Sequence, residues 1–262
     1  SLSKTKLSGL VSVIGGPEGH FAIVARSLSI PTLVGVKNIL KDLKDNEPII
    51  LDGEKGILIK NPKLSTINYY KKKIEDQKNV DKKLNFLKKK TPLTSDNIRV
   101  RVEANIDNSD EAKEAMKIGI DGIGLLRSEY MFMDKKRMPS EKEQFYFIKK
   151  TLNHLKGKPL TIRTLDVGND KKVPFIEKFL GKSPNPALGL RAIRLTLAFP
   201  RIFKRQISAI LRASKFGKIR IMLPMVSNVS EILEAKKLIN DVSKDLSLKK
   251  KEFNRRNIKI GV

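Results

Sequence analysis

The chain of 262 residues contains no cysteine and no tryptophan, and it has only two histidines, His20 and His154. Without cysteine this chain can form no disulfide framework and no thiolate metal site, and it offers no thiol nucleophile. It has no run of eighteen or more apolar residues, and its N-terminus lacks the apolar core of a signal peptide. We therefore expect a cytoplasmic protein that does not cross a membrane.

Acidic residues are also scarce, because 28 Asp and Glu stand against 54 Lys and Arg, which gives a formal net charge of +26. Clustered cations would indicate nucleic-acid binding, since they release counterions from a phosphate backbone. The excess is mostly lysine spread along the chain, and its densest part, residues 69–90, interleaves acids and amides. This pattern is typical of a solvated helix face. We expect no nucleic-acid binding, and a basic nucleic-acid-binding protein remains the non-enzyme alternative.

The first third of the chain has two differently patterned parts. In residues 11–62 short apolar runs surround one helix, with a turn after Asp52, which predicts a small α/β module. In residues 65–90 glycine and proline disappear and apolar residues recur at helical spacing, interrupted by Gln77 and Asp81. This second part predicts a long, only partly buried connecting helix.

The remaining sequence alternates strands with helices. We predict strands at 98–106, 122–126, 160–167, 219–225 and 258–262, and helices near 109–118, 141–154, 188–214 and 228–246. One helix after each strand indicates a parallel sheet, either open or wound into a (β/α)8 barrel. A closed barrel needs eight strands, so five strands predict that the chain stops in the middle of a domain.

Charged residues follow two of the predicted strands. Arg127 comes after the second strand with Glu129 beside it, and Arg163 lies in the third, shortly before Asp166. Ligands of α/β sheets gather at the carboxyl ends of the strands, where two arginines could clamp a phosphate or carboxylate dianion. Alternatively, each arginine pairs with a nearby acid in a buried salt bridge. Spacing alone leaves the two interpretations open.

His20 stands in the stretch "GGPEGHFAIVARS", residues 15–27. A helix that begins near Pro17 or Gly19 would place His20 in its first turn. There the helix dipole disfavours the imidazolium form, and free backbone N–H groups can receive an anion. The arrangement suits a phosphohistidine, and the alternative is a surface histidine on a glycine turn. His154, by contrast, is expected to lie near a helix C-terminus.

The stretch "GGPEGHFAIVARSLSIPTLVG" resembles the phosphohistidine motif of PEP-utilising enzymes. The downstream segments "GIGLLRSEYMFMD", "PSEKEQF", "TIRTLDVGNDKKVPF", "NPALGLRAIRL" and "ILRASKFGKIRIMLPM" resemble enzyme I of the phosphoenolpyruvate-dependent phosphotransferase system, in the same order and spacing. This resemblance covers nearly the full chain, from about residue 10 to residue 262.

The resemblance implies an α/β fold with three parts. Residues 1–64 would be the C-terminal part of a swivelling phosphohistidine domain, and residues 65–92 a linker helix. Residues 93–262 would be the first five strands of a PEP-binding (β/α)8 barrel. The chain is then a central fragment of a longer protein, and we expect it to be inactive on its own.

The resemblance also implies roles for residues. By motif match, His20 takes the phosphoryl group of phosphoenolpyruvate (PEP) and passes it to a histidine phosphocarrier protein, while Arg127 of "LLRSEY" and Arg163 of "TIRTLD" hold PEP. A magnesium ion takes part in the family's reaction, with ligands expected beyond residue 262, so no metal ligand is assigned within this chain. The full-length family members form homodimers.

The sequence departs from the family's motifs at two positions, and two alternative assignments remain. Gly19 stands where the family usually has Ser or Thr, and Asn169 replaces a usual glycine. Pyruvate phosphate dikinase and PEP synthase share the histidine motif but require a nucleotide-binding domain. A regulatory branch of the same family differs from the sugar-uptake branch in regions outside this chain.

Overall fold

A computed structural model of the chain describes residues 7–16, 21–22, 25, 30–88, 90–133, 135–168, 173–177, 180, 185 and 189–262. The contacts within it define two compact units, Ser1–Lys89 and Lys90–Val262. The predicted three-part division, with boundaries after residues 64 and 92, stays a prediction. Among the described residues, no helix combines the length and the apolar character needed to cross a membrane.

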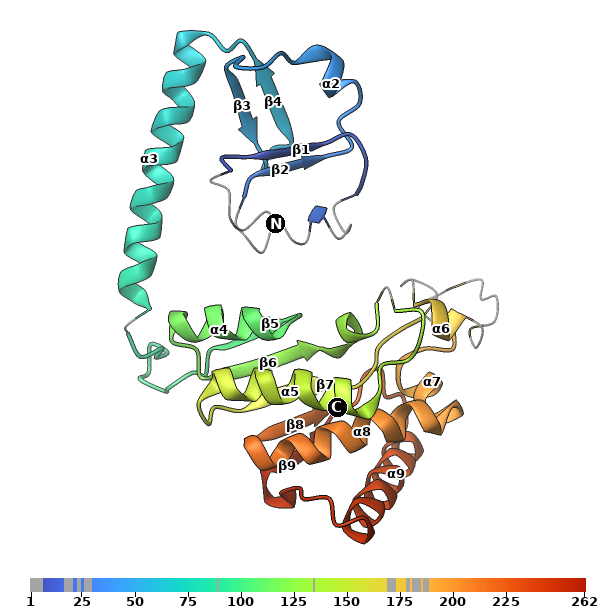
Figure 1. The fold of residues 1–262 in the computed structure, drawn as a ribbon. Helices are drawn as coiled ribbons and strands as arrows, with labels where there is room; N and C mark the ends of the chain where they lie inside the picture. The colour runs from blue at the N-terminus through green and yellow to red at the C-terminus, as the bar shows by residue number, and fades with distance from the viewer. Residues whose placement is uncertain are drawn as a thin grey trace. The chain divides into compact units, whose positions relative to one another are not determined.

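The first unit contains two small sheets (Figure 1). Its strands and short helix are β1 (Leu10–Ser12) parallel to β2 (Thr32–Val34), α2 (Ile39–Asp42), and β3 (Ile49–Asp52) antiparallel to β4 (Ile57–Lys60). The predicted turn after Asp52 is present, because the Asp52 carboxylate accepts hydrogen bonds from the backbone N–H groups of Glu54 and Lys55. The predicted small α/β module is confirmed.

The connecting helix is α3 (Leu64–Leu87), which contains no buried residue. Its half-buried positions all lie in its first ten residues, and every residue from 74 to 87 is exposed. The two residues that interrupt its apolar stripe pair with each other, since Gln77 Nε2 donates to Asp81 Oδ1 at 3.2 Å. Local pairs one turn apart therefore contribute to this helix where core packing does not.

The second unit is built on one five-stranded parallel sheet in the order β5-β6-β7-β8-β9. The strands are β5 (Glu103–Ile106), β6 (Gly122–Arg127), β7 (Leu160–Arg163), β8 (Ile219–Met222) and β9 (Ile258–Gly261). Each strand pairs with the next one in the chain, which is the order of a barrel, whereas a doubly wound sheet reverses its order partway. The five strands match those predicted for the first part of a (β/α)8 barrel.

The main helices of this unit pack in series, each against the next: α4 (Ser109–Ile118), α5 (Glu141–Leu155), α8 (Pro200–Ala213) and α9 (Val229–Leu248). Together with the strands they enclose the larger of two hydrophobic clusters that the described residues form in this unit, which includes Ile123, Leu160, Ile162, Ile219 and Ile221. The shorter helical segments are η2 (Ser128–Met131), α6 (Pro174–Glu177), α7 (Ala192–Ala198), η3 (Ser214–Phe216) and η4 (Arg255–Asn257).

Local caps explain why three helices begin where the sequence predicts. The Asn108 side chain accepts from two backbone N–H groups at the start of α4, and Ser140 and Asn228 form capping boxes at the starts of α5 and α9. His154 lies in the last turn of α5, as expected. These boundaries depend only on neighbouring residues.

Several predicted elements differ in extent. The helix predicted at 188–214 is two helices, because Pro200 begins α8 directly after Phe199, whose backbone is not helical. The strand predicted at 160–167 ends at Arg163, because the Leu165 N–H donates to the Gln206 side chain instead of to a neighbouring strand. The strand predicted at 98–106 begins only at Glu103.

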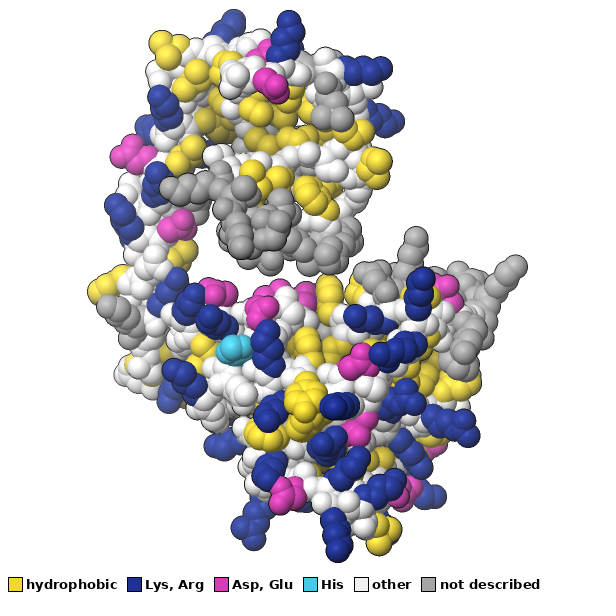
Figure 2. All heavy atoms as spheres, viewed as in Figure 1, with side chains coloured by type: hydrophobic (Ala, Val, Ile, Leu, Met, Phe, Trp, Pro, Cys, Tyr) yellow, Lys and Arg dark blue, Asp and Glu magenta, His cyan; other side chains and the backbone are white. Residues whose placement is uncertain are grey.

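Cations do not gather in one patch on the face that Figure 2 shows. Lys and Arg side chains are spread over the second unit there, with Asp and Glu side chains among them. This distribution is that of a solvated surface rather than of a continuous phosphate-binding stripe.

Candidate substrate-binding site at the carboxyl ends of the strands

The two predicted arginines lie next to each other. Arg127 is the last residue of β6 and Arg163 is the last residue of β7, and the parallel register makes them direct partners. Both side chains therefore start from the edge of the sheet where ligands of α/β proteins bind. His20 lies outside the described residues, and so does Asn169; just after His20, Phe21, Ala22 and Ala25 are helical.

Arg127 pairs with Asp107, which directly follows β5. Arg127 Nε lies 2.7 Å from Asp107 Oδ1, and the guanidinium carbon lies 5.7 Å from the centre of the Tyr130 ring. Burial raises the pKa of Asp107 above its ordinary value, and the positive charge of Arg127 opposes that rise. The carboxylate is thus costly to ionise here, and Arg127 offsets part of the cost.

Arg163 belongs to a more buried network. Its Nη2 pairs with Glu129, whose side chain is 1% exposed, and its Nη1 lies 3.5 Å from Asp166 Oδ2. Arg191, just before α7, contacts the other oxygen of Asp166 at 2.9 Å. Removal of Arg163 would leave the Glu129 carboxylate buried without this partner, which typically costs several kcal/mol.

The structure therefore combines the two interpretations that spacing left open. The guanidinium groups come from adjacent strands, as a clamp requires, and each of them is also paired with an acid. Across this network, three arginines and three carboxylates balance in formal charge. A dianion that binds through Arg163 must displace carboxylates from its guanidinium group or arrive with a cation.

A buried glutamine ties the two strand ends together. Gln206 of α8 donates from Nε2 to the Ser128 hydroxyl at 2.9 Å, and its Oε1 accepts from the Leu165 N–H at 3.0 Å. Ser128 follows Arg127, and Leu165 comes two residues after Arg163, so the bridge links the two segments that carry the arginines. All three bridge residues are buried.

Sequence reasoning missed three members of this site. Asp107 could have been found by the rule applied to the arginines, because it also follows a predicted strand. Arg191 lies within "NPALGLRAIRL", one of the segments noted above, without having been singled out. Gln206 stands in the middle of an amphipathic helix, and no local signal distinguishes it.

The described residues do not provide a metal site. They include no group of three or more His, Cys, Asp or Glu side chains that could hold a metal ion. They therefore do not by themselves fit the magnesium ion that the resemblance implies, and we derive no step through it.

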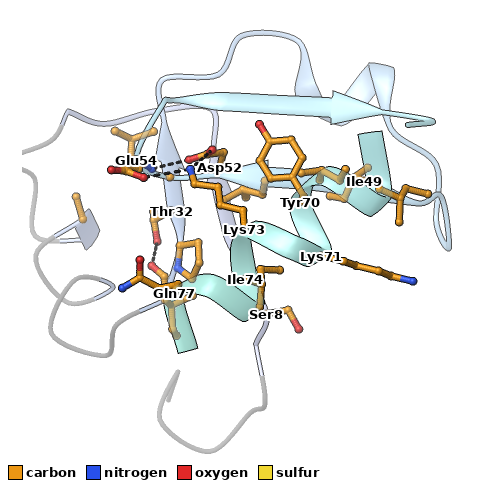
Figure 3. Close-up of a pocket in the computed structure, with 18 residues that line it drawn as sticks. Ser8, Thr32, Ile49, Asp52, Glu54, Tyr70, Lys71, Lys73, Ile74 and Gln77 are labelled. Atoms are coloured by element: carbon orange, nitrogen blue, oxygen red, sulfur yellow. Dashed lines mark hydrogen bonds and ion pairs between the residues drawn. The ribbon is translucent and has the colours of Figure 1, made fainter. Parts of the chain in front are cut away.

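The first unit has a cavity of about 840 Å³ between its sheets and α3 (Figure 3). Apolar side chains such as Ile50, Ile67 and Ile74 form much of its lining. Lys73 lies over it and pairs with Asp52 at 3.0 Å and with Glu54 at 3.2 Å. Since Lys73 is already paired with both carboxylates, we assign no chemistry to the cavity.

The chain belongs to the family of PEP-utilising enzymes. Residues 81–262 match the PEP-binding domain of that family, and residues 2–56 match its mobile domain. Among curated proteins, the chain is 40% identical over 240 residues to the phosphoenolpyruvate-protein phosphotransferase of Staphylococcus carnosus, which covers 92% of this chain and 42% of the relative. It is 38% identical over 238 residues to the protein of that name from Geobacillus stearothermophilus, covering 91% of this chain and 41% of the relative.

These matches confirm the resemblance found in the sequence. The chain spans about 42% of the length of the curated relatives that it matches. The order of the two matched regions, mobile domain first and PEP-binding domain second, also agrees with the predicted α/β organisation.

Proposed function

We propose that this chain is the central part of an enzyme that transfers the phosphoryl group of PEP to His20 and then to a histidine phosphocarrier protein. The observation that carries the proposal is that Arg127 and Arg163 lie side by side in the strand register, at the ends of β6 and β7. Both lie within the region matched to a PEP-binding domain. By the same resemblance, we expect a cytoplasmic enzyme that is a homodimer when full length.

PEP has the charges that this site can hold. Its phosphate and carboxylate are both anionic, and planar guanidinium groups bind such groups through two parallel hydrogen bonds. Phosphoryl transfer proceeds through a loose transition state with charge on the peripheral oxygens, so positioning and cationic stabilisation provide most of the catalysis. Arg127 and Arg163 would supply part of that positive charge.

The proposed reaction consists of two successive transfers of the phosphoryl group. The neutral ring nitrogen of His20 attacks phosphorus, the bond from phosphorus to the enolate oxygen breaks, and the enolate takes up a proton to become pyruvate. The phosphoryl group then passes to a histidine of the carrier, which restores neutral His20. Within the network of Arg163, binding of PEP requires an exchange of partners, because acids occupy both Nη groups in the structure described here.

Labelling the full-length protein tests this proposal. After exposure to ³²P-labelled PEP with magnesium, we expect an acid-labile label on His20 that His20→Ala abolishes. His154→Ala is the matched control and should keep the label, because His154 lies in the last turn of α5. Label on another residue, or full labelling of His20→Ala, would overturn the proposal.

A second variant tests the substrate-binding role. Arg127→Ala is cleaner than Arg163→Ala, because the Arg127 side chain is 41% exposed whereas Arg163 neutralises a buried carboxylate. Loss of one cationic group that contacts the transition state typically costs about 3 kcal/mol, so we expect labelling of His20 to slow about 100-fold. An unchanged rate of labelling would show that Arg127 does not bind PEP.

A further inference from the structure

Arg127 is held by one edge of its guanidinium group. Its Nε atom and the Oδ1 atom of Asp107 are both fully buried, and they lie at ion-pair distance without the alignment of a hydrogen bond. Yet 41% of the Arg127 side chain is exposed. The exposed part must therefore lie elsewhere on the side chain than Nε, and the Nη1 and Nη2 atoms form its far end.

Tyr130 completes the support of this arginine. Its ring lies 5.7 Å from the guanidinium carbon of Arg127, and the Tyr130 hydroxyl acts to lower the pKa of Asp107 while the Asp107 carboxylate acts to raise the pKa of Tyr130. The three residues come from different segments, since Asp107 follows β5, Arg127 ends β6 and Tyr130 lies in η2. The Asp107 carboxyl thus contacts the guanidinium group and interacts electrostatically with the Tyr130 hydroxyl.

The two arginines differ in what they can offer a ligand. Glu129 and Asp166 occupy both Nη groups of Arg163. For Arg127, no hydrogen bond to Nη1 or Nη2 occurs among the residues described, and its 2.7 Å contact with Asp107 is made through Nε. Arg127 can therefore present its two-pronged end to an anion without first breaking a hydrogen bond to an acid among the described residues.

We propose that Asp107 and Tyr130 are positioning residues that hold Arg127 by its Nε edge, so that its Nη1 and Nη2 groups are presented to the phosphate or carboxylate of PEP. This inference rests on the proposed function and deepens it. A flexible arginine must be immobilised when it binds a ligand, and a side chain that is already held loses less freedom in doing so.

Asp107 could instead compete with PEP for Arg127, and that role predicts different behaviour of the variants. In that case any change that removes the negative charge of Asp107 would raise kcat/KM for PEP. If Asp107 positions Arg127, alanine should impair the reaction, whereas asparagine should rescue it, because asparagine has the same shape and keeps an oxygen that can face the Nε edge of Arg127.

The experiment measures kcat/KM for PEP in His20 labelling by the full-length protein. We expect Asp107→Ala to lower kcat/KM about tenfold, Asp107→Asn to restore it to within about threefold of wild type, and Tyr130→Phe to lower it a few-fold. Asp110→Ala is the matched control, because Asp110 pairs with Lys150 at 2.8 Å on the start of α4, and it should leave kcat/KM unchanged.

A double mutant separates positioning from a general structural role. In the Arg127→Ala background, Asp107→Ala should cause no further loss, because its effect passes through Arg127. An additive loss would overturn the inference, as would an unchanged or higher kcat/KM in Asp107→Ala alone. If Arg127→Ala itself has no effect, the substrate-binding part of the proposed function fails instead.

Discussion

Replacement of Gln206 by leucine should destabilise the protein strongly although the two side chains are similar in size. Gln206 is 1% exposed and satisfies two buried groups, the Leu165 N–H and the Ser128 hydroxyl. A buried donor left without a partner costs about 1–3 kcal/mol, and the Ser128 hydroxyl can rotate to reduce its share. We therefore expect Gln206→Leu to lower the free energy of unfolding by about 3 kcal/mol.

A second buried glutamine provides the control. Gln144 is also 1% exposed, but it donates one hydrogen bond, to the Pro139 carbonyl at 3.0 Å, and its Oε1 has no hydrogen-bond partner among the described residues. Gln144→Leu removes an unsatisfied acceptor as well as a donor, so we expect a loss of about 1 kcal/mol or less. The contrast between the two substitutions isolates hydrogen bonding from the change of side-chain type.

The assay is urea unfolding of the full-length protein, with hydrogen exchange of the peptide that contains Leu165 as a local measurement. Gln206→Leu should accelerate exchange at this peptide, and Gln144→Leu should not. In the double mutant Ser128→Ala/Gln206→Leu, one orphaned group is gone, so the loss should be smaller than the sum of the single losses. If Gln206→Leu is as stable as wild type, the bridge does not hold the two strand ends together.

Two further predictions concern the second unit. A Cβ atom on Gly122 would lie 2.8 Å from the Pro159 carbonyl oxygen, so Gly122→Ala should lower the free energy of unfolding by about 1–3 kcal/mol, whereas Gly261→Ala, which meets no atom within 4 Å, should not. Equal urea midpoints for the two variants would contradict this packing argument. Hydrogen bonding to Arg137 lowers the pKa of Glu143 to about 2, so the stability that ionised Glu143 contributes is present above its ordinary pKa of 4.5 and is lost as the pH falls towards about 2. Urea unfolding across this range should show the difference between wild type and Glu143→Gln shrinking with pH, and a constant difference would refute the assignment.

Local chemistry accounts for the elements that the sequence predicted well. The start of α4 depends on Asn108, and the starts of α5 and α9 depend on Ser140 and Asn228, each acting on a neighbour no more than three residues away. The hairpin turn after Asp52 depends on hydrogen bonds over two and three residues. Such signals can be read from a short window because every partner lies inside it.

Elements that depend on distant partners were predicted less well. The third strand ends early because Leu165 bonds to Gln206, which is 41 residues away in the chain. The acid that each arginine contacts is equally hard to predict from a short window, because Arg163 pairs with Glu129, which is 34 residues away in the chain. Spacing placed acids near both arginines, but it could not distinguish a clamp from a salt bridge.

Sequence by itself determined the alternation of strands and helices, the caps, and the two motif arginines at neighbouring strand ends, because periodicity and short-range hydrogen bonds are properties of adjacent residues. Only the tertiary structure decided that Asp107 contacts Arg127 at its Nε atom while Glu129 and Asp166 contact the Nη atoms of Arg163. The physical reason is that these contacts depend on the register between strands and on burial, which are established when the whole sheet packs against its helices.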